Sequence, residues 1–321
     1  ELADIAFQTN SRRGLAKSPR RRADLTREAL WSYTLLSPFL IVYFVFVLTP
    51  ILVGIGLSVM KWDGIHGATF IGFDNFQQVF TNKPIIKAFG NLFYFVALQV
   101  PVAVVVGLGL ALFLDRFSSR SATILRAILL LPFVMPMFLS AAIWLWMMVP
   151  QFGLFNQLTS VFGLGDVQWL SDPKYMVPGL VIVETWRSAG FNMVLFYAGL
   201  KAIPRDTVEA ARIDGANTFQ EIVFVIMPQL APITFIIAVN ALLGTFQVFD
   251  LPWLLSKSGF VEGQGGAGSG LLFPVMQAVS TAFGALRFGR AAAISVILLI
   301  LIVVATMVMF GLRRLSRRQD V

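Results

Sequence analysis

Cysteine is absent from the 321-residue chain, and histidine occurs once, as His66. Without thiols the chain has no disulfide, no thiolate metal site and no cysteine nucleophile, and a single imidazole cannot form a histidine metal cluster. We expect His66 to lie solvated in a loop. Charged side chains are also scarce, at 13% of residues, against about a quarter in ordinary soluble domains.

Hydrophobic residues, in contrast, make up 57% of the chain, and the mean hydropathy is +0.78. This composition predicts an all-α integral membrane protein rather than a large soluble core. The net charge is +8. In a membrane protein such an excess reflects topology, so we expect no nucleic acid partner and a basic N-terminal arm that contacts membrane lipid.

A phosphate-binding loop is also missing. The glycine-rich stretch GFVEGQGGAGSG, from Gly259 to Gly270, lacks the Gly-Lys-Ser/Thr that holds a nucleotide. It is expected to be a flexible external loop. The chain itself is therefore predicted to bind no cofactor and to perform no bond chemistry, and any uphill transport must draw energy from an ion gradient or a partner.

Six apolar stretches reach the length of about 20 residues that crosses a bilayer as a helix. They run from Tyr33 to Met60, Ala88 to Leu114, Ala127 to Val149, Tyr175 to Leu200, Ile222 to Leu251, and Ala291 to Leu312. Prolines within or at the rim of these stretches predict kinks rather than breaks, because neighbouring helices can satisfy the freed backbone groups. These prolines are Pro38, Pro50, Pro101, Pro132, Pro136, Pro228 and Pro232.

Basic residues are concentrated in the N-terminal arm, the second-to-third and fourth-to-fifth connections and the tail, which predicts that both termini are cytoplasmic in a multi-pass cell-membrane protein. The predicted organisation is an arm (1–32), a first spanning helix with a short external loop (33–87), a five-helix core (88–312) and a basic tail (313–321). Trp62, Trp144 and Trp146 are expected in the aromatic belt at the membrane interface.

A polar segment, 203–228, separates two apolar stretches on the predicted cytoplasmic side; we call it the elbow. Pro204 suits the first turn of a helix in which Asp206 and Glu209 form a capping pair. Gly215 ends that helix in the left-handed conformation, and Thr218 with Glu221 forms a capping box that starts the next one. Small and charged side chains line the first helix: Glu209, Ala210, Ala211, Arg212 and Asp214.

The elbow resembles a known family. EAARIDG, nine further residues, then VIMP are similar to the Glu-Ala-Ala signature of permease subunits in binding-protein-dependent ABC importers, with Val225 and Met227 as conservative departures. In that family the signature helix couples the permease to an ATPase subunit. The resemblance assigns this role to Glu209, Ala210, Ala211 and Gly215, with Arg212 and Asp214 at the edge of the contact.

The resemblance covers most of Asn91 to Leu312, and it is to carbohydrate-uptake permeases of the MalF type. The sequence FIGFDNF, from Phe70 to Phe76, is also typical of these permeases. It implies a six-helix type I permease fold and a bacterial cell membrane location. It also implies a second related permease, two ATPase subunits that hold ATP and Mg²⁺, and an extracytoplasmic sugar-binding protein or lipoprotein. Alternating access and a disaccharide such as trehalose or maltose are implied in the same way.

Polar residues inside the predicted spans are candidates for the substrate path, because charged groups in a bilayer cost about 2.5–3.5 kcal/mol and persist mainly for function. Glu184 and Arg187 lie three apart on one helix face and can pair. Sugars are bound by planar polar groups and aromatic faces. The predicted path residues are Glu184, Arg187, Asn192, Asn240, Gln247 and Asp250. Each can equally serve as interhelical hydrogen-bonding glue.

Two other functions stay open from the sequence. An importer of glycerol-phosphate diesters has very similar subunits, and an anionic substrate would favour Arg187 as a direct ligand. An ion-coupled secondary carrier needs a buried titratable site, for which Glu184 is the candidate. A scaffold without transport activity would leave the elbow unexplained.

Overall fold

The computed structural model describes residues 20–117, 119–163, 167–256 and 265–319, and it is almost entirely helical. The chain divides between Val53 and Gly54 into two compact units. The residues before Arg20, including most of the predicted basic arm, lie outside the described ranges, and so do the last two residues of the predicted tail.

The described N-terminal segment consists of α1 (Arg20–Tyr43), a π-helical turn η1 (Phe44–Leu48) and α2 (Thr49–Ser58). Together Trp31–Ser58 is an apolar helix of 28 residues, and none of its most apolar window is buried within the described chain. The π turn precedes Pro50, which lacks an amide proton, and the Thr49 hydroxyl donates to the Phe44 carbonyl at 2.9 Å. An apolar helix of this length, with its most apolar part unburied, fits a lipid environment.

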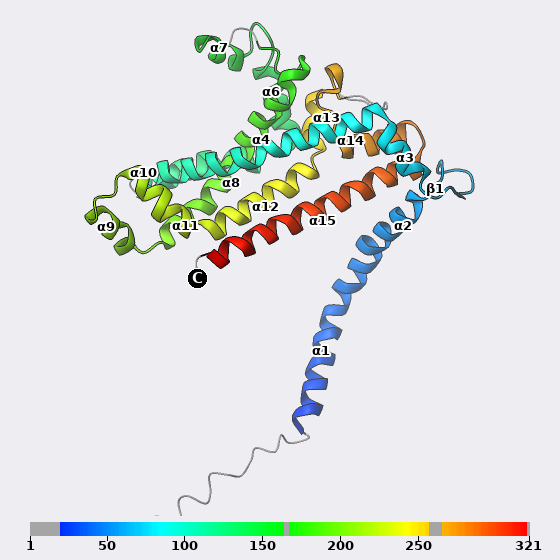
Figure 1. Cartoon of the computed structure of the whole chain (residues 1–321), viewed down its shortest axis with the longest axis horizontal. Coiled ribbons are helices and arrows are strands. Elements are labelled where there is room, and N and C mark those ends of the chain that lie inside the picture. Colours follow the sequence, from blue (N-terminus) through cyan, green and yellow to red (C-terminus); the bar gives the residue numbers. More distant parts are fainter. Residues whose placement is uncertain (1–19, 118, 164–166, 257–264, 320–321) are drawn as a thin grey trace, which may run out of the picture. The chain divides into compact units, whose positions relative to one another are not determined.

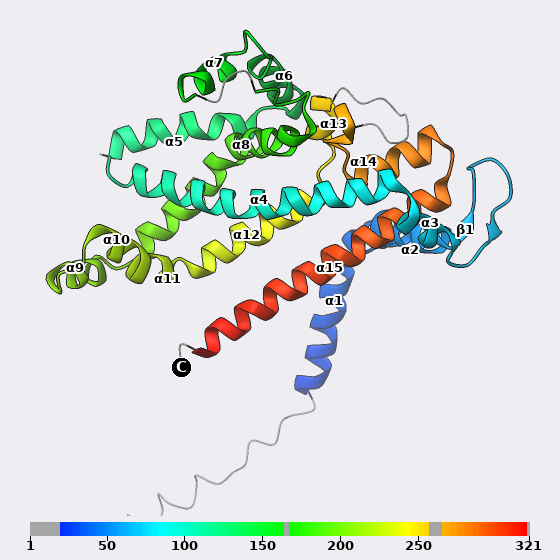
Figure 2. The same ribbon diagram turned by 45° about the horizontal axis from the view of Figure 1, so that its top comes forward.

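A small antiparallel hairpin, β1 (Met60–Lys61) and β2 (Thr69–Phe70), begins the larger unit and is followed by α3 (Asp74–Thr81). The Asn75 amide nitrogen donates to the carbonyls of Ser58 and Met60 at 2.9 and 2.8 Å. These bonds fix the hairpin at one end of the helical bundle, which we call the hairpin end (Figures 1 and 2).

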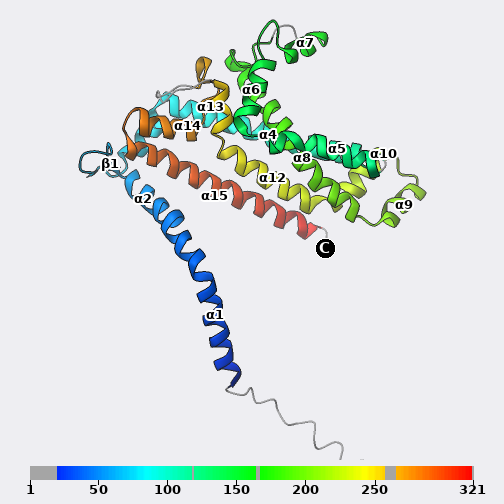
Figure 3. The ribbon, with the colours of Figure 1, turned by 180° about the vertical axis from the view of Figure 1, so that it is seen from behind.

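The bundle is built on α4 (Lys83–Leu114), which packs against both α8 (Pro173–Ala202) and α12 (Ala231–Phe246). The last helix, α15 (Phe288–Gln319), runs beside α12, and α5 (Ser119–Val134) lies against α8 (Figure 3). Buried apolar side chains fill the interfaces; the largest include Phe95, Phe196 and Phe273. The elbow lies at the end of the bundle opposite the hairpin (Figure 1).

Glycine allows close helix contacts in the bundle. A β-carbon built on Gly190 of α8 would lie 2.0 Å from the backbone oxygen of Leu129 in α5. Gly107 of α4 similarly faces Asn192 of α8, where an added β-carbon would meet the Asn192 side chain at 2.8 Å. Small residues at such contacts let helices approach in the membrane, where dispersion and hydrogen bonds replace the hydrophobic effect.

Two predicted spans are broken rather than kinked, which corrects the expectation for their prolines. The third bends by 98° between α5 and α6 (Met137–Met147). Pro136 stands at the N-terminal cap of α6, where its missing amide proton is not needed. The fifth bends by 74° where α11 (Met227–Gln229) meets α12. Pro38, Pro101 and Pro132, in contrast, lie inside continuous helices.

Among the described residues, three helices are long and apolar enough to cross a membrane, or up to five if each bent pair is one span. The expected fourth span corresponds to α8, a helix of 30 residues. Its mean hydropathy is too low for it to count among these helices, because Glu184, Arg187 and Asn192 lie within its central part. The six-span count therefore remains a prediction that this fold accommodates.

Two parts of the chain are more buried than the sequence suggested: the part of α6 around Trp144, and the connection before α15. Trp144 in α6 is only 5% exposed, and its ring meets those of Phe155 and Trp186 edge-on, so it does not lie in an aromatic belt. Trp146, on the same helix, is 63% exposed. The bend before α6 explains the difference, since it turns one face of that short helix toward α8. The short helix α7 (Leu154–Val161) follows α6.

The connection between α13 (Asp250–Ser256) and α15 also enters the core. It contains a 3-10 turn η3 (Ala267–Ser269), α14 (Pro274–Val279) and a π turn η4 (Ser280–Gly284). The Asn91 amide nitrogen donates to the carbonyls of Ser269 and Leu272 at 2.8 and 2.9 Å. The described part of the glycine-rich stretch is thus tied to α4 rather than free.

Candidate functional site

One cavity of about 290 Å³ lies between α4, α8 and α12. All six residues predicted for the substrate path line it: Glu184, Arg187, Asn192, Asn240, Gln247 and Asp250. On α8 the lining positions are 184, 187, 188, 191 and 192, which is the spacing of one helix face. The sequence therefore identified residues that the fold brings together from two separate stretches, 184–192 and 240–250.

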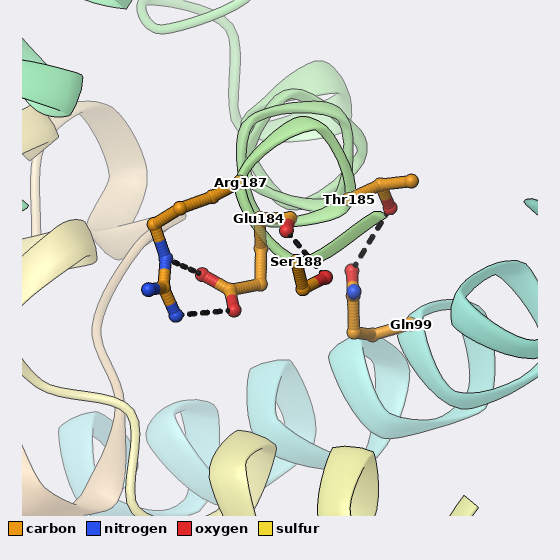
Figure 4. Close-up of polar contacts among 5 residues, drawn as sticks. All are labelled: Gln99, Glu184, Thr185, Arg187 and Ser188. Carbon is orange, nitrogen blue, oxygen red and sulfur yellow. Dashed lines mark hydrogen bonds and ion pairs between the residues drawn. The ribbon is translucent and has the colours of Figure 1, made fainter. Parts of the chain in front are cut away.

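The centre of the cavity wall is an ion pair on α8 (Figure 4). The Arg187 Nε donates to Glu184 Oε2 at 3.1 Å, and its Nη2 donates to Oε1 at 2.8 Å. The two side chains are about 20% exposed. This bidentate pairing occupies one edge of the guanidinium and both carboxylate oxygens, so the pair presents no net charge to the cavity.

Neutral hydrogen-bonding groups surround the pair. The Ser188 hydroxyl donates to the Glu184 carbonyl at 2.8 Å, and the Thr185 hydroxyl faces the Gln99 side-chain oxygen at 3.5 Å (Figure 4). Gln99 and Asn192 are almost fully buried. Among the described lining residues the remaining charged one is Asp250, which gives the cavity a single excess negative charge.

Aromatic rings form the rest of the wall, and the sequence analysis did not single them out. Phe133 of α5 and Phe191 of α8 stack with their centroids 4.8 Å apart and planes inclined by 12°. Phe95 and Phe249 also line the cavity. Phe191 could have been found from its spacing, since it lies four residues after Arg187 on the polar face. The others depend on how the helices pack.

The elbow begins with α9 (Arg205–Ile213), whose N-terminal cap is Pro204. No side chain caps this end of the described helix, so the predicted capping pair of Asp206 and Glu209 is wrong. The C-terminal end is as predicted: Gly215 has φ +88°. The Ala216 amide donates to Ala211 and the Gly215 amide to Arg212, which together make a Schellman motif.

The next helix begins one residue earlier than predicted. Asn217 accepts from the Gln220 amide, and the Gln220 side chain accepts from the Asn217 amide, both at 2.9 Å. This is a capping box, and it leads through α10 (Thr218–Gln220) into a π-helix, η2 (Glu221–Ile226). The expected box of Thr218 and Glu221 is wrong because the Glu221 carboxylate binds Arg212 instead.

The elbow presents an exposed surface. Within α9, all of which is described, no side chain is buried; Glu209, Ala210, Arg212 and Asp214 are exposed and Ala211 is partly so. Two large apolar side chains stand beside them, Ile213 at 86% and Phe219 at 72% exposure. A mixed apolar and charged surface on a short rigid helix is suited to contact with another protein.

A second cavity of about 700 Å³ lies at the hairpin end, between the hairpin, α3 and the start of α15. His66 is on its rim, with its ring 2.5 Å from an Asp63 carboxylate oxygen. His66 is exposed, as expected of a loop residue, but it is paired. The hydrogen bond and the charge of Asp63 raise the pKa of His66, so this contact is strongest at low pH and weakens as pH rises through that raised pKa.

An all-helical membrane protein with a polar cavity among its helices and an exposed helical elbow fits the class of transport permeases. Residues 99–321 match the family described as the binding-protein-dependent transport system inner membrane component. The chain belongs to this family. The predicted family and the predicted all-α permease fold are thereby confirmed.

Named relatives cover nearly the whole chain. It is 29% identical over 293 residues to the trehalose/maltose transport system permease protein MalF of Thermococcus litoralis, covering 91% of this chain and 96% of that one. It is 27% identical to the lactose transport system permease protein LacF of Rhizobium radiobacter, covering 85% and 91%. A bacterial ABC transporter that imports the acidic polysaccharide alginate matches with a TM-score of 0.75 at 24% identity, over 93% and 99% of the two chains; this likeness concerns the fold.

Proposed function

We propose that the chain is the permease subunit of an ABC importer for a neutral sugar, which it translocates by alternating access. Its partners would be a second, related permease, two ATPase subunits that hold ATP and Mg²⁺, and an extracytoplasmic sugar-binding protein or lipoprotein. Both termini and the elbow would be cytoplasmic. The observation that carries the proposal is the polar, aromatic-walled cavity, which α12 connects to the exposed elbow.

The cavity chemistry supports a sugar. Amide and hydroxyl side chains offer donors and acceptors for sugar hydroxyls, and the stacked pair of Phe133 and Phe191 offers a flat apolar face. The volume of about 290 Å³ is near the lower end of ordinary ligand pockets, and the second permease would complete the path. The named relatives transport trehalose, maltose and lactose, so a disaccharide such as trehalose or maltose is part of the proposal.

The charge of the cavity favours a neutral substrate over the glycerol-phosphate diester alternative. An anion would need a free cation, and Arg187 is already bound by both Glu184 oxygens. Asp250 would repel the anion further. The same pairing weakens the ion-coupled carrier hypothesis, because the Glu184 carboxylate is bound to Arg187 rather than isolated.

Site-specific cross-linking tests the elbow's partner. Since the chain has no cysteine, Ala210→Cys introduces a unique thiol on α9. With a thiol-directed photo-cross-linker on the assembled transporter, we expect a product containing the ATPase subunit. Gly67→Cys, in the loop between β1 and β2, is the matched control and should give no such product. Equal capture at both positions, or none at position 210, would contradict the proposal.

Uptake by amide variants tests the cavity. Asn240→Ala and Gln247→Ala each remove one hydrogen-bonding side chain from the cavity wall. A lost hydrogen bond of about 0.5–1.5 kcal/mol corresponds to a reduction in sugar uptake of roughly two- to tenfold. ATP hydrolysis stimulated by the binding protein should persist. Gln157→Ala, an exposed amide on α7, is the control, and unchanged uptake by both cavity variants would remove them from the path.

A further inference from the structure

The link between α9 and η2 consists of an ion pair nine residues apart in sequence. The Arg212 Nε donates to Glu221 Oε2 at 2.8 Å, and its Nη2 donates to Oε1 at 2.9 Å. The Glu221 side chain is 10% exposed, whereas that of Arg212 is 62% exposed. The pair therefore joins an exposed helix to a carboxylate fixed inside the bundle with bidentate geometry, unlike a typical surface pair between two mobile side chains.

The position of α9 depends on this pair together with the backbone hydrogen bonds of the Schellman motif at Gly215. This helix has no buried side chain, so apolar packing does not fix its direction. The chain between α9 and α10 turns at Gly215, where φ is +88° and no described atom lies within 4 Å of a built β-carbon. Glycine there allows the turn but does not resist bending. The Arg212–Glu221 pair spans this turn and closes it.

The other side of the pair is anchored. Downstream of Glu221, Ile226 and Leu230 are buried in one cluster with Met193 and Phe196 of α8. Leu230 stands at the 74° bend into α12, and α12 carries Asn240 and Thr245 into the cavity wall. A π-helical turn such as η2, inside a helical segment, frequently occurs at functional positions.

We propose that the Arg212–Glu221 pair is the strut that transmits movement of α9 to α12 and so to the cavity. Glu221 is then a positioning residue for coupling, and Arg212, which the resemblance also places at the edge of the ATPase contact, positions α9 through Glu221. The inference rests on the proposed function for its biological meaning. Its mechanical content, that the pair holds α9 at a fixed orientation, concerns this chain alone.

The coupling test uses the complete transporter in proteoliposomes with its binding protein and measures sugar uptake per ATP hydrolysed. Glu221→Gln is expected to lower that ratio at least fivefold while ATP hydrolysis changes less than twofold, and Arg212→Gln should lower the ratio by a similar factor. The double variant Arg212→Glu with Glu221→Arg should recover most of the ratio. A merely structural pair would lower uptake and hydrolysis together, and that outcome, or an unchanged ratio in the single variants, overturns the strut.

A matched control comes from another ion pair. Lys201 and Asp115 join α8 to the C-terminal cap of α4 at 2.6 Å, with both side chains about half exposed. Asp115→Asn removes a comparable charge pair that does not span the elbow. It should leave the uptake ratio within twofold of the unaltered transporter. A fall as large as that of Glu221→Gln would show that the effect is general and would overturn the proposal.

Backbone hydrogen exchange separates the strut from the sugar. In the purified transporter without substrate, amides of residues 205–213 should exchange at least threefold faster in Glu221→Gln, whereas those of α4 should be unchanged. If residues 205–213 exchange faster in Glu221→Gln but the unaltered transporter takes up no sugar, the proposed substrate is refuted and the strut is retained. Unchanged exchange in α9 would refute the strut and leave the substrate proposal standing.

Discussion

Gly190→Ala is expected to prevent α5 from packing on α8 and to reduce the melting temperature of the purified protein sharply. The added β-carbon would lie 2.0 Å from the Leu129 carbonyl oxygen, 2.6 Å from its carbon and 3.0 Å from the Leu130 α-carbon. All three are backbone atoms, so no side-chain rotation relieves the contact and α5 must move away. Overpacking of this kind costs about 1–3 kcal/mol or more. Size-exclusion profiles after heating in detergent measure the loss.

The control for this variant is expected to keep or raise the melting temperature rather than lower it. Gly109→Ala is also in a long helix, α4, but no described heavy atom lies within 4 Å of its built β-carbon. Alanine in an open helical position favours the helix by about 0.5–1 kcal/mol over glycine, so this variant should melt at an equal or higher temperature. If both variants behaved alike, the close approach of α5 and α8 would not be the cause.

Glu184→Gln is expected to be the second strongly damaging change. It removes the bidentate partner of Arg187 and leaves that guanidinium without its salt bridge in the middle of α8. A charge at such a depth costs about 2.5–3.5 kcal/mol on insertion scales, reduced here by the access that the cavity gives to water. We expect less folded protein in the membrane and a lower melting temperature, both measured after detergent extraction.

The double variant Glu184→Gln with Arg187→Gln tests whether the loss of stability comes from an Arg187 charge without its partner. Removing both members of a buried pair is often tolerated, because no charge remains without a partner. The double variant should therefore be more stable than Glu184→Gln alone. If instead the two substitutions damaged the protein additively, the residues would act separately, and the cavity would not contain a neutralised pair.

The sequence predicted much of the helical scaffold and, at Gly215, the end of α9. It also identified six residues that line one cavity, because polar groups within apolar stretches are rare and face the bundle interior or a water-filled cavity. The phenylalanines of the cavity wall could not be recognised in the same way. A chain with 30 phenylalanines gives no sign of which few meet, and Phe133 and Phe191 meet only because α5 crosses α8 at Gly190.

The elbow shows why a local pattern can be misread by one residue. Asn217 with Gln220 and Thr218 with Glu221 both satisfy the spacing of a capping box. The choice depends on Arg212, which engages Glu221 across nine residues and leaves Asn217 and Gln220 to cap the helix. Such a competition is invisible to any rule that considers one turn of helix at a time.

The breaks at Pro136 and Leu230 were underestimated for a related reason. Proline inside an apolar stretch is compatible with a kink or a break, and neighbouring elements decide between them. After Pro136, α6 turns so that Trp144 meets Trp186, a contact that a straight helix would not make. The buried connection before α15 was missed because α14, with six residues, is far too short to produce a spanning signal.

The bend at Leu230 has a geometric consequence. With α12 acting as an arm of 16 residues, its far end lies about 24 Å from the pivot at 1.5 Å per residue. A rotation of about 5° there would displace Phe246 by roughly 2 Å, but Asn240, about 15 Å from the pivot, by little more than 1 Å. Tilting this arm about Leu230 would therefore displace the end of α12 beside Gln247 more than the part that carries Asn240.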